Sequence, residues 1–379
     1  MKRFFRKIEF LFKKLRLFFT QIFGEKKVWV ILFFTALTFG LVFFSFWFFK
    51  IQPKVLFEKV LTAVSFGGKK SEPPKVEAPV QKEVYHRLLD GAVVDSREKV
   101  NPPLFAVMIE NIIEARPLSG VSKANLVYEA ISEAGITRLL AIYTADNSAE
   151  EIGPVRSTRP YYLDWAEEYG ALYAHCGGSP EALRAMPEYD ILNLDQFFNS
   201  QYFWRSSKRF APHNLYTSTE LLNKAVKNKE WETKNFEDWL FKEEPKIEER
   251  PVEEKQITID FSKPNYKVGW KYNSEKNDYL RYQAGEVQKD ADGSEVRAKN
   301  IVVQFVRMQI VDSVGRKKIE TIGNGEAQVF LDGKDIEGRW VKIEKGDRTK
   351  FYDESGEEIK FNPGITWIEV VPIGTEVEF

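Results

Sequence analysis

The 379 residues are 43% hydrophobic and 29% charged, which excludes wholesale disorder and allows two or three domains. Lys and Arg number 55 against 56 Asp and Glu, a formal charge of -1, but residues 1–27 hold nine basic and two acidic residues. The remainder therefore has 46 basic and 54 acidic residues, a balance of -8, which argues against nucleic acid as a partner. One cysteine, Cys176, excludes an intramolecular disulfide and a cysteine-based zinc cluster.

Residues 28–49 form an uncharged run that is almost wholly apolar or aromatic. As a helix, 22 residues span about 33 Å, which matches a bilayer core of about 30 Å. The run is too long for a cleaved signal peptide, and no cysteine follows it that a lipid could modify. It therefore predicts one transmembrane helix.

The basic residues of 1–27 place the N-terminus in the cytoplasm and residues 50–379 outside the membrane, by the positive-inside rule. Within this segment, residues 2–23 alternate basic and apolar side chains at helical spacing. Two interpretations remain open, an amphipathic helix on the inner leaflet or a simple topogenic flank. Both predict the lipid bilayer as a partner and a cell-membrane location.

Pro and Gly residues in 50–84 indicate a linker, and a Glu- and Lys-rich stretch at 241–255 indicates a second one. These linkers divide the outer part into domains at 85–240 and 256–379. In the first, the sequence predicts strands at 104–109, 126–130, 139–143 and 171–174, and helices after Arg159 and Ser179 and at 221–227, the last capped by a box at 217–220. This alternation indicates a layered α/β or α+β domain.

The second domain is predicted to be a small all-β sandwich or partly open barrel. Its expected strands are 257–261, 301–311, 327–331, 340–343 and 367–371, with hairpin turns at 331–334 and 354–357.

Basic and polar residues of the first domain lie beside predicted strand ends. Arg156 and Arg159 occur three residues apart before a helix, where two guanidinium groups and free N–H groups suit a phosphate or carboxylate. Gly177 and Gly178 precede a second helix start. The candidate ligand-binding residues are Arg116, Lys123, Asn125, Arg138, Arg156, Arg159, His175, Gly177, Gly178, Ser179, His213 and Asn214.

Glu110 is the candidate catalytic base, or a ligand of Mg²⁺ or Mn²⁺ together with Asn125. Whether the protein is an enzyme stays open, and no cofactor is certain. Purely structural roles are the alternative: ion pairs for the two arginines, a tight turn for the two glycines, a hydrogen-bonding role for Glu110 and a packing role for His175. The acids considered as partners of Arg156 and Arg159 are Glu150, Glu151 and Asp164.

Many short motifs occur in one order over residues 85–379. They are 106–111 (AVMIEN), 115–120 (ARPLSG), 122–129 (SKANLVYE), 152–160 (IGPVRSTRP), 175–180 (HCGGSP) and 211–216 (APHNLY), then 323–327 (GNGEA), 338–340 (GRW) and 363–367 (PGITW). This set resembles the YerB-like bacterial envelope family with its two domains. The resemblance implies a membrane- or lipid-anchored envelope protein. Many family members look like lipoproteins, whereas this chain has an apolar run in place of a lipidated cysteine.

The first domain is also similar to the LytR-CpsA-Psr phosphotransferases, which attach glycopolymers to the bacterial wall from a polyprenyl-pyrophosphate carrier. That similarity implies metal-holding positions at Glu110 and Asn125 and pyrophosphate-binding arginines at Arg156 and Arg159. The chain departs at both metal positions, since aspartates are expected there. Two functions are therefore expected: a module that binds an anionic envelope ligand or a partner protein, or a metal-dependent phosphotransferase or pyrophosphatase.

Overall fold

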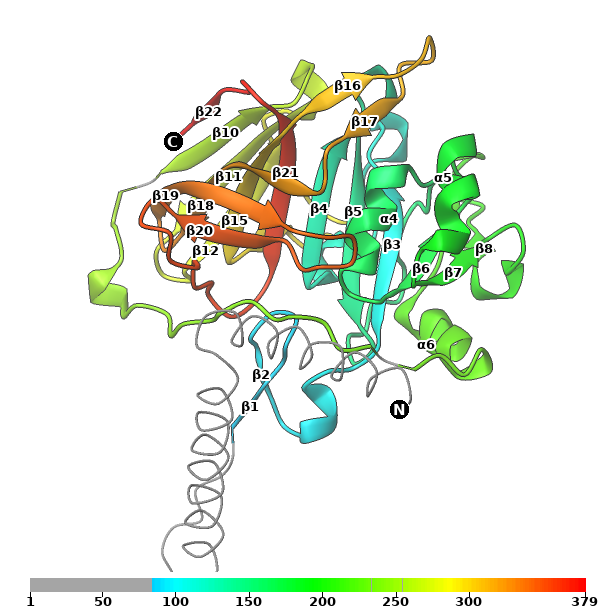
Figure 1. Cartoon of the computed structure of the whole chain (residues 1–379), viewed down its shortest axis with the longest axis horizontal. Helices are drawn as coiled ribbons and strands as arrows, with labels where there is room; N and C mark the ends of the chain where they lie inside the picture. The colour runs from blue at the N-terminus through cyan, green and yellow to red at the C-terminus, as the bar shows by residue number, and fades with distance from the viewer. Residues whose placement is uncertain (1–83, 233, 254) are drawn as a thin grey trace, which may run out of the picture. The chain divides into compact units, whose positions relative to one another are not determined.

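The computed structural model describes residues 84–232, 234–253 and 255–379 (Figure 1). The expected cytoplasmic segment, the transmembrane segment 28–49 and most of the first linker lie outside these residues. No helix within the described ranges is long and apolar enough to cross a membrane.

The described chain is mostly β, with few helices. In its first part the strands are β1 (Tyr85–His86), β2 (Val93–Val94), β3 (Leu104–Glu110), β4 (Leu126–Ile131), β5 (Thr137–Thr144), β6 (Leu172–His175), β7 (Leu192–Asp195), β8 (Trp204–Arg205) and β9 (Leu215–Tyr216). The helices are α4 (Pro160–Glu167), α5 (Pro180–Ala185) and α6 (Thr219–Asn228). The predicted strands and helices of this part are therefore present. The cap of α6 differs by one residue, because the Ser218 side chain, not that of Thr217, accepts from the Leu221 N–H.

The second part contains strands only, apart from short 3₁₀ turns. They are β10 (Gln256–Asp260), β11 (Lys267–Asn273), β12 (Asp278–Gln283), β13 (Glu286–Val287), β14 (Arg297–Ala298), β15 (Asn300–Val306), β16 (Met308–Ile310), β17 (Lys317–Ile319), β18 (Gly323–Leu331), β19 (Lys334–Lys342), β20 (Lys350–Asp353), β21 (Thr366–Pro372) and β22 (Val377–Glu378). The strand expected at 301–311 is broken at Arg307, and β11 and β12 were not predicted.

A ten-stranded sheet runs through both parts of the chain, in the order β20-β19-β18-β15-β21-β4-β5-β3-β6-β7. The two parts join where β21 pairs in parallel with β4, so that Glu369 lies beside Glu129. The second-part strands β10 to β14 and β22 form a separate six-stranded sheet. The charged segment 241–255 is tied to the second part, since Lys242 Nζ lies 2.6 Å from Asp332 and 2.8 Å from Asn362.

The central strands are buried on both faces, which explains their continuous apolar sequences. All seven side chains of β3 are buried. On one face, Trp367 of β21 meets Trp270 of the six-stranded sheet, with ring centroids 5.2 Å apart. On the other face α4 covers the sheet (Figure 1), and Trp165 stacks on Tyr128 of β4 at 4.9 Å. The ends of these covered strands are where polar side chains reach the surface.

Candidate functional site

One buried carboxylate holds two basic side chains at the end of β3. Glu110 is 4% exposed, and its Oε1 lies 3.1 Å from Arg156 Nε. Its Oε2 lies 2.8 Å from His213 Nδ1. The backbone fixes this arrangement, because the Glu110 N–H donates to Pro154 and the Arg156 N–H donates to Met108, so the arginine segment runs along the strand end.

The outer nitrogen atoms of both basic residues remain available. Among the described residues, neither the two Nη atoms of Arg156 nor Nε2 of His213 has a hydrogen-bond or ion-pair partner. The Arg156 and His213 side chains are 28% and 22% exposed. Glu110 therefore orients a permanent cation with two free Nη groups, and an imidazole whose Nδ1–H faces the carboxylate. The free Nε2 of that ring donates a hydrogen bond only when the ring is protonated. The set carries a net charge of zero with His213 neutral and +1 with it protonated.

Arg159 and Arg138 form a second, separate cluster around Glu133. Arg159 contacts this carboxylate through two nitrogens, Nε at 2.5 Å and Nη2 at 2.8 Å, and Arg138 Nη2 lies 3.4 Å away. Burial opposes ionisation of Glu133, but the hydrogen bonds and charge of Arg159 outweigh it and lower the pKa to about 2. The two arginines of the predicted anion loop thus have different carboxylate partners, and neither partner is one of the acids considered from the sequence.

The segment that contains Arg156 and Arg159 lies beside the Gly177-Gly178 turn. A single anion site built from both segments would require this proximity. The Cys176 N–H donates to Arg156 O at 3.1 Å, and the Thr158 N–H donates to Gly177 O at 3.0 Å. A Cβ at Gly178 would lie 2.7 Å from Thr158 Cγ2, so the close approach needs glycine. The backbone groups of the two segments therefore satisfy each other, which leaves few of them for a ligand.

His175 and Ser179 hold this turn in place. The His175 ring is fully buried, with Nδ1 2.8 Å from Gly177 O and Nε2 2.8 Å from Asn193 Oδ1. The Ser179 side chain caps α5 by accepting from the Ala182 N–H. Both contacts agree with the structural alternative for these residues.

Asn125 lies far from Glu110. Its Nδ2 donates to Asp90 at 2.7 Å, and its Oδ1 accepts from the Thr144 N–H at 3.1 Å. Glu110 pairs with Arg138 at the opposite end of β5. Six residues of strand separate Arg138 from Thr144, about 20 Å, so Glu110 and Asn125 do not share one cation. No group of three or more His, Cys, Asp or Glu side chains in the described ranges could hold a metal.

The other candidate residues lie around or away from the Glu110 cluster. Arg116 donates to Asn111 and stacks over the ring of Tyr266, 5.1 Å from its centroid. Lys123 lines a separate groove of about 540 Å³ that includes Glu150 and Glu151. Arg116 therefore joins the two parts of the chain, whereas Lys123 faces a different surface from the Glu110 cluster.

Asn214 and Arg205 extend the cluster, and sequence reasoning missed the arginine. Arg205 Nη1 donates to Asn214 Oδ1 at 2.8 Å within the β8–β9 hairpin, whose loop contains His213. Burial raises the pKa of the nearby Cys176 thiol, although the charges of Arg205 and Arg156 oppose the shift. The thiol is therefore not activated as a nucleophile. The pairing of 204–205 with 215–216 is the signal that would have found Arg205.

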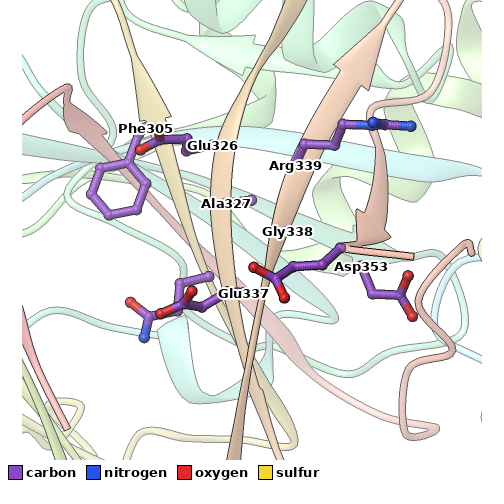
Figure 2. Close-up of a pocket in the computed structure, with 9 residues that line it drawn as sticks. Phe305, Glu326, Ala327, Glu337, Gly338, Arg339 and Asp353 are labelled. Atoms are coloured by element: carbon purple, nitrogen blue, oxygen red, sulfur yellow. The ribbon is translucent and has the colours of Figure 1, made fainter. Parts of the chain in front are cut away.

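Another groove, away from the Glu110 cluster, is predominantly acidic. It is a groove of about 640 Å³ over β18, β19 and β20 (Figure 2). Its charged lining residues are Glu326, Glu337, Arg339, Asp353 and Glu354. The register places Glu326 opposite Arg339, so the positive charge of the arginine balances one of the negative charges of the groove. None of the candidate ligand-binding residues lines this groove, but the motifs at 323–327 and 338–340 contribute Glu326, Ala327, Gly338 and Arg339 to it.

A charged cluster that the sequence did not reveal lies between the two sheets. Arg281 of β12 is fully buried, donates to Glu129 through Nη2 and lies with Nε 3.9 Å from Glu369 Oε1. Its guanidinium stacks 4.5 Å from the ring centroid of Trp367. Being closed to solvent, this cluster serves to hold the sheets together rather than to bind a ligand.

Comparison with known proteins agrees with this architecture of two parts. Residues 89–232 match the family model described as the N-terminal domain of a protein of unknown function, DUF3048, and residues 257–368 match the C-terminal domain of the same family. The chain therefore belongs to the DUF3048 family, as the YerB-like motifs predicted.

YerB of Bacillus subtilis is similar to most of the chain, both in sequence and in its crystal structure. It is 32% identical over 302 residues to a protein of Bacillus subtilis strain 168 named "Putative lipoprotein YerB", covering 74% of this chain and 89% of the relative. The crystal structure of the YerB protein from Bacillus subtilis superposes with a TM-score of 0.68 at 29% identity, covering 78% of this chain and 99% of that one. Both comparisons confirm the predicted resemblance.

Proposed function

We propose that this protein is a membrane-associated, extracytoplasmic binding protein that holds an anionic group of the cell envelope, a phosphate or carboxylate, between Arg156 and His213. The carrying observation is that Glu110 contacts both residues through their inner nitrogens and leaves three outer nitrogens unpartnered among the described residues. Two side chains oriented in this way suit an anion, such as phosphate or carboxylate, that accepts a hydrogen bond from each of them.

Membrane association is supported by two independent facts. The relative from Bacillus subtilis carries the name of a lipoprotein, and residues 28–49 of this chain are long and apolar enough for an anchor. An extracytoplasmic location follows from the basic N-terminal flank.

The proposed site is narrower than the set expected from the sequence. Arg159 and Arg138 both pair with Glu133 in a separate cluster, and Asn125 lies at the other end of the sheet. The metal-dependent phosphotransferase alternative needs Glu110 and Asn125 on one cation, so the geometry offers no support for it. Binding without turnover is the function that the site supports best.

Calorimetry of the full chain with inorganic phosphate and pyrophosphate tests the proposal. Charge-assisted hydrogen bonds contribute about 1.5–3 kcal/mol each, so Arg156→Ala should weaken binding by roughly tenfold or more. The matched control is Arg307→Ala, which removes an exposed arginine elsewhere.

Two results would count against the site. One is the absence of saturable heat with both anions at pH 5.5. The other is equal weakening by Arg156→Ala and Arg307→Ala, which would indicate general charge attraction rather than a defined pocket.

A further inference from the structure

The β16–β17 hairpin stands apart from both large sheets. Its two strands pair only with each other, and Figure 1 shows the hairpin projecting beyond the body of the fold. Its base is fixed, because Ile319 is buried and Thr321 Oγ1 donates to Asp164 of α4 at 2.6 Å. The far end, residues 310–316, is therefore presented on a rigid base.

This far end carries apolar side chains that no part of the fold covers. Ile310, Val311 and Val314 are 65%, 49% and 60% exposed. Single exposed aliphatic residues are ordinary, but three at one projecting turn form a local apolar surface that marks an interaction site.

The charges around the apolar end are predominantly basic. Arg316 pairs with Asp312 at 2.8 Å, and Arg307 lies 3.9 Å from Glu320. Lys317 and Lys318 have no ion-pair partner in the described part of the chain. The hairpin thus presents two uncompensated positive charges beside three aliphatic side chains.

We propose that the end of this hairpin inserts into the surface of an anionic lipid bilayer, with Lys317 and Lys318 at the headgroups. The proposal rests on the membrane association proposed above. Aliphatic side chains at the acyl boundary and lysines beside anionic lipid are the two stabilising terms of interfacial binding.

The bilayer is within reach of the body. Thirty-four residues separate the apolar run 28–49 from Val84, the first described residue. A chain of that length spans at most about 110–120 Å, so a body anchored through this run can reach the same membrane, and a second contact would then be intramolecular.

The test uses the full chain in lipid nanodiscs, with Cys176→Ser and an environment-sensitive fluorophore on Ser313→Cys at the exposed turn. Nanodiscs of phosphatidylcholine are compared with nanodiscs that also contain anionic phosphatidylglycerol. We expect a blue shift of the fluorophore with the anionic lipid, and quenching by lipids that carry a spin label near the headgroup. The matched control places the same fluorophore on Ser355→Cys, at the exposed polar turn after β20, where no shift is expected.

Substitutions separate the two stabilising terms. Val314→Asp should abolish the shift, whereas Ile343→Asp, at an even more exposed aliphatic residue outside the hairpin, should leave it unchanged. Lys317→Gln and Lys318→Gln should each lower the ratio of inserted to free hairpin about fivefold, since each basic residue contributes about 1 kcal/mol at an anionic surface.

Several outcomes would overturn the proposal. If the fluorophores at 313 and 355 give the same spectra in anionic nanodiscs, the hairpin does not insert and its surface belongs to a protein partner. A shift that survives Val314→Asp has the same consequence. Failure of the chain to incorporate into nanodiscs would instead refute the membrane association, and loss of phosphate binding in Arg156→Ala with an unchanged shift would concern the anion site alone.

Discussion

The buried cluster of Arg281, Glu129 and Glu369 predicts an unusual dependence of stability on pH. The two carboxyl groups occupy neighbouring positions on β4 and β21, and both are closed to solvent. Burial in the first place, and then the negative charge of Glu129, raise the pKa of Glu369 to about 8. At neutral pH the cluster therefore contains one cation, one carboxylate and one protonated acid, which together are neutral.

The size and sign of the effect follow from the difference between the folded and unfolded states. An unfolded glutamate titrates near pH 4.3, and one unit of pKa corresponds to about 1.4 kcal/mol. The folded state holds the proton more tightly, so the free energy of unfolding falls as the pH rises from about 4.3 to about 8 and is constant above that range. Within this range the free energy of unfolding falls by up to about 1.4 kcal/mol for each pH unit.

Glu369→Gln imitates the protonated acid at every pH. The amide keeps an oxygen for Trp270 Nε1, which donates to Glu369 Oε1 at 2.8 Å. We expect a small change in stability at pH 5 and a gain that grows by about 3 kcal/mol between pH 5 and pH 7.

Urea denaturation of residues 82–379, the compact unit of the chain, followed by tryptophan fluorescence at several pH values, measures this gain. Glu326→Gln, on the open groove, is the control and should leave the pH dependence unchanged. Equal slopes of stability against pH for Glu369→Gln and the parent would refute the reasoning, as would a uniform loss of stability at every pH.

Three further substitutions test other contacts by the same denaturation assay. Glu133→Gln should lower the free energy of unfolding by about 1–2 kcal/mol at pH 7, after screening by solvent. Because the folded pKa of Glu133 is lowered to about 2, the parent should lose this stability as the pH falls from about 4.3 towards 2. A difference between variant and parent that does not depend on pH would contradict this reasoning. Gly178→Ala should cost about 1–3 kcal/mol, and Thr158→Ser should restore part of it by removing the methyl group in the way. Lys342→Met should cost about 3–5 kcal/mol, since it strands the buried Glu168 carboxylate 2.9 Å away, and adding Glu168→Gln should recover much of the loss.

Features that depend on a few neighbouring residues could be predicted from the sequence. The continuous apolar run 104–109 predicts a strand buried on both faces, and β3 is one. Asp332 and Gly333 predict a two-residue turn, and both adopt the positive φ angles that such a hairpin needs. Ser179 and Pro180 predict the start of α5. The order of the motifs also predicted the family, because that order can be read from the sequence without knowledge of any contact.

The partners of the charged side chains were decided by the tertiary structure alone. Glu110 meets His213 across 103 residues of sequence, and Glu129 meets Arg281 across 152. Strand register determines such pairs, and a shift of one residue would turn each side chain to the opposite face. The sequence could therefore identify Arg156 and Arg159 as candidates. Only the packing of β3 against the 152–158 segment determines that Arg156 pairs with Glu110 and Arg159 with Glu133.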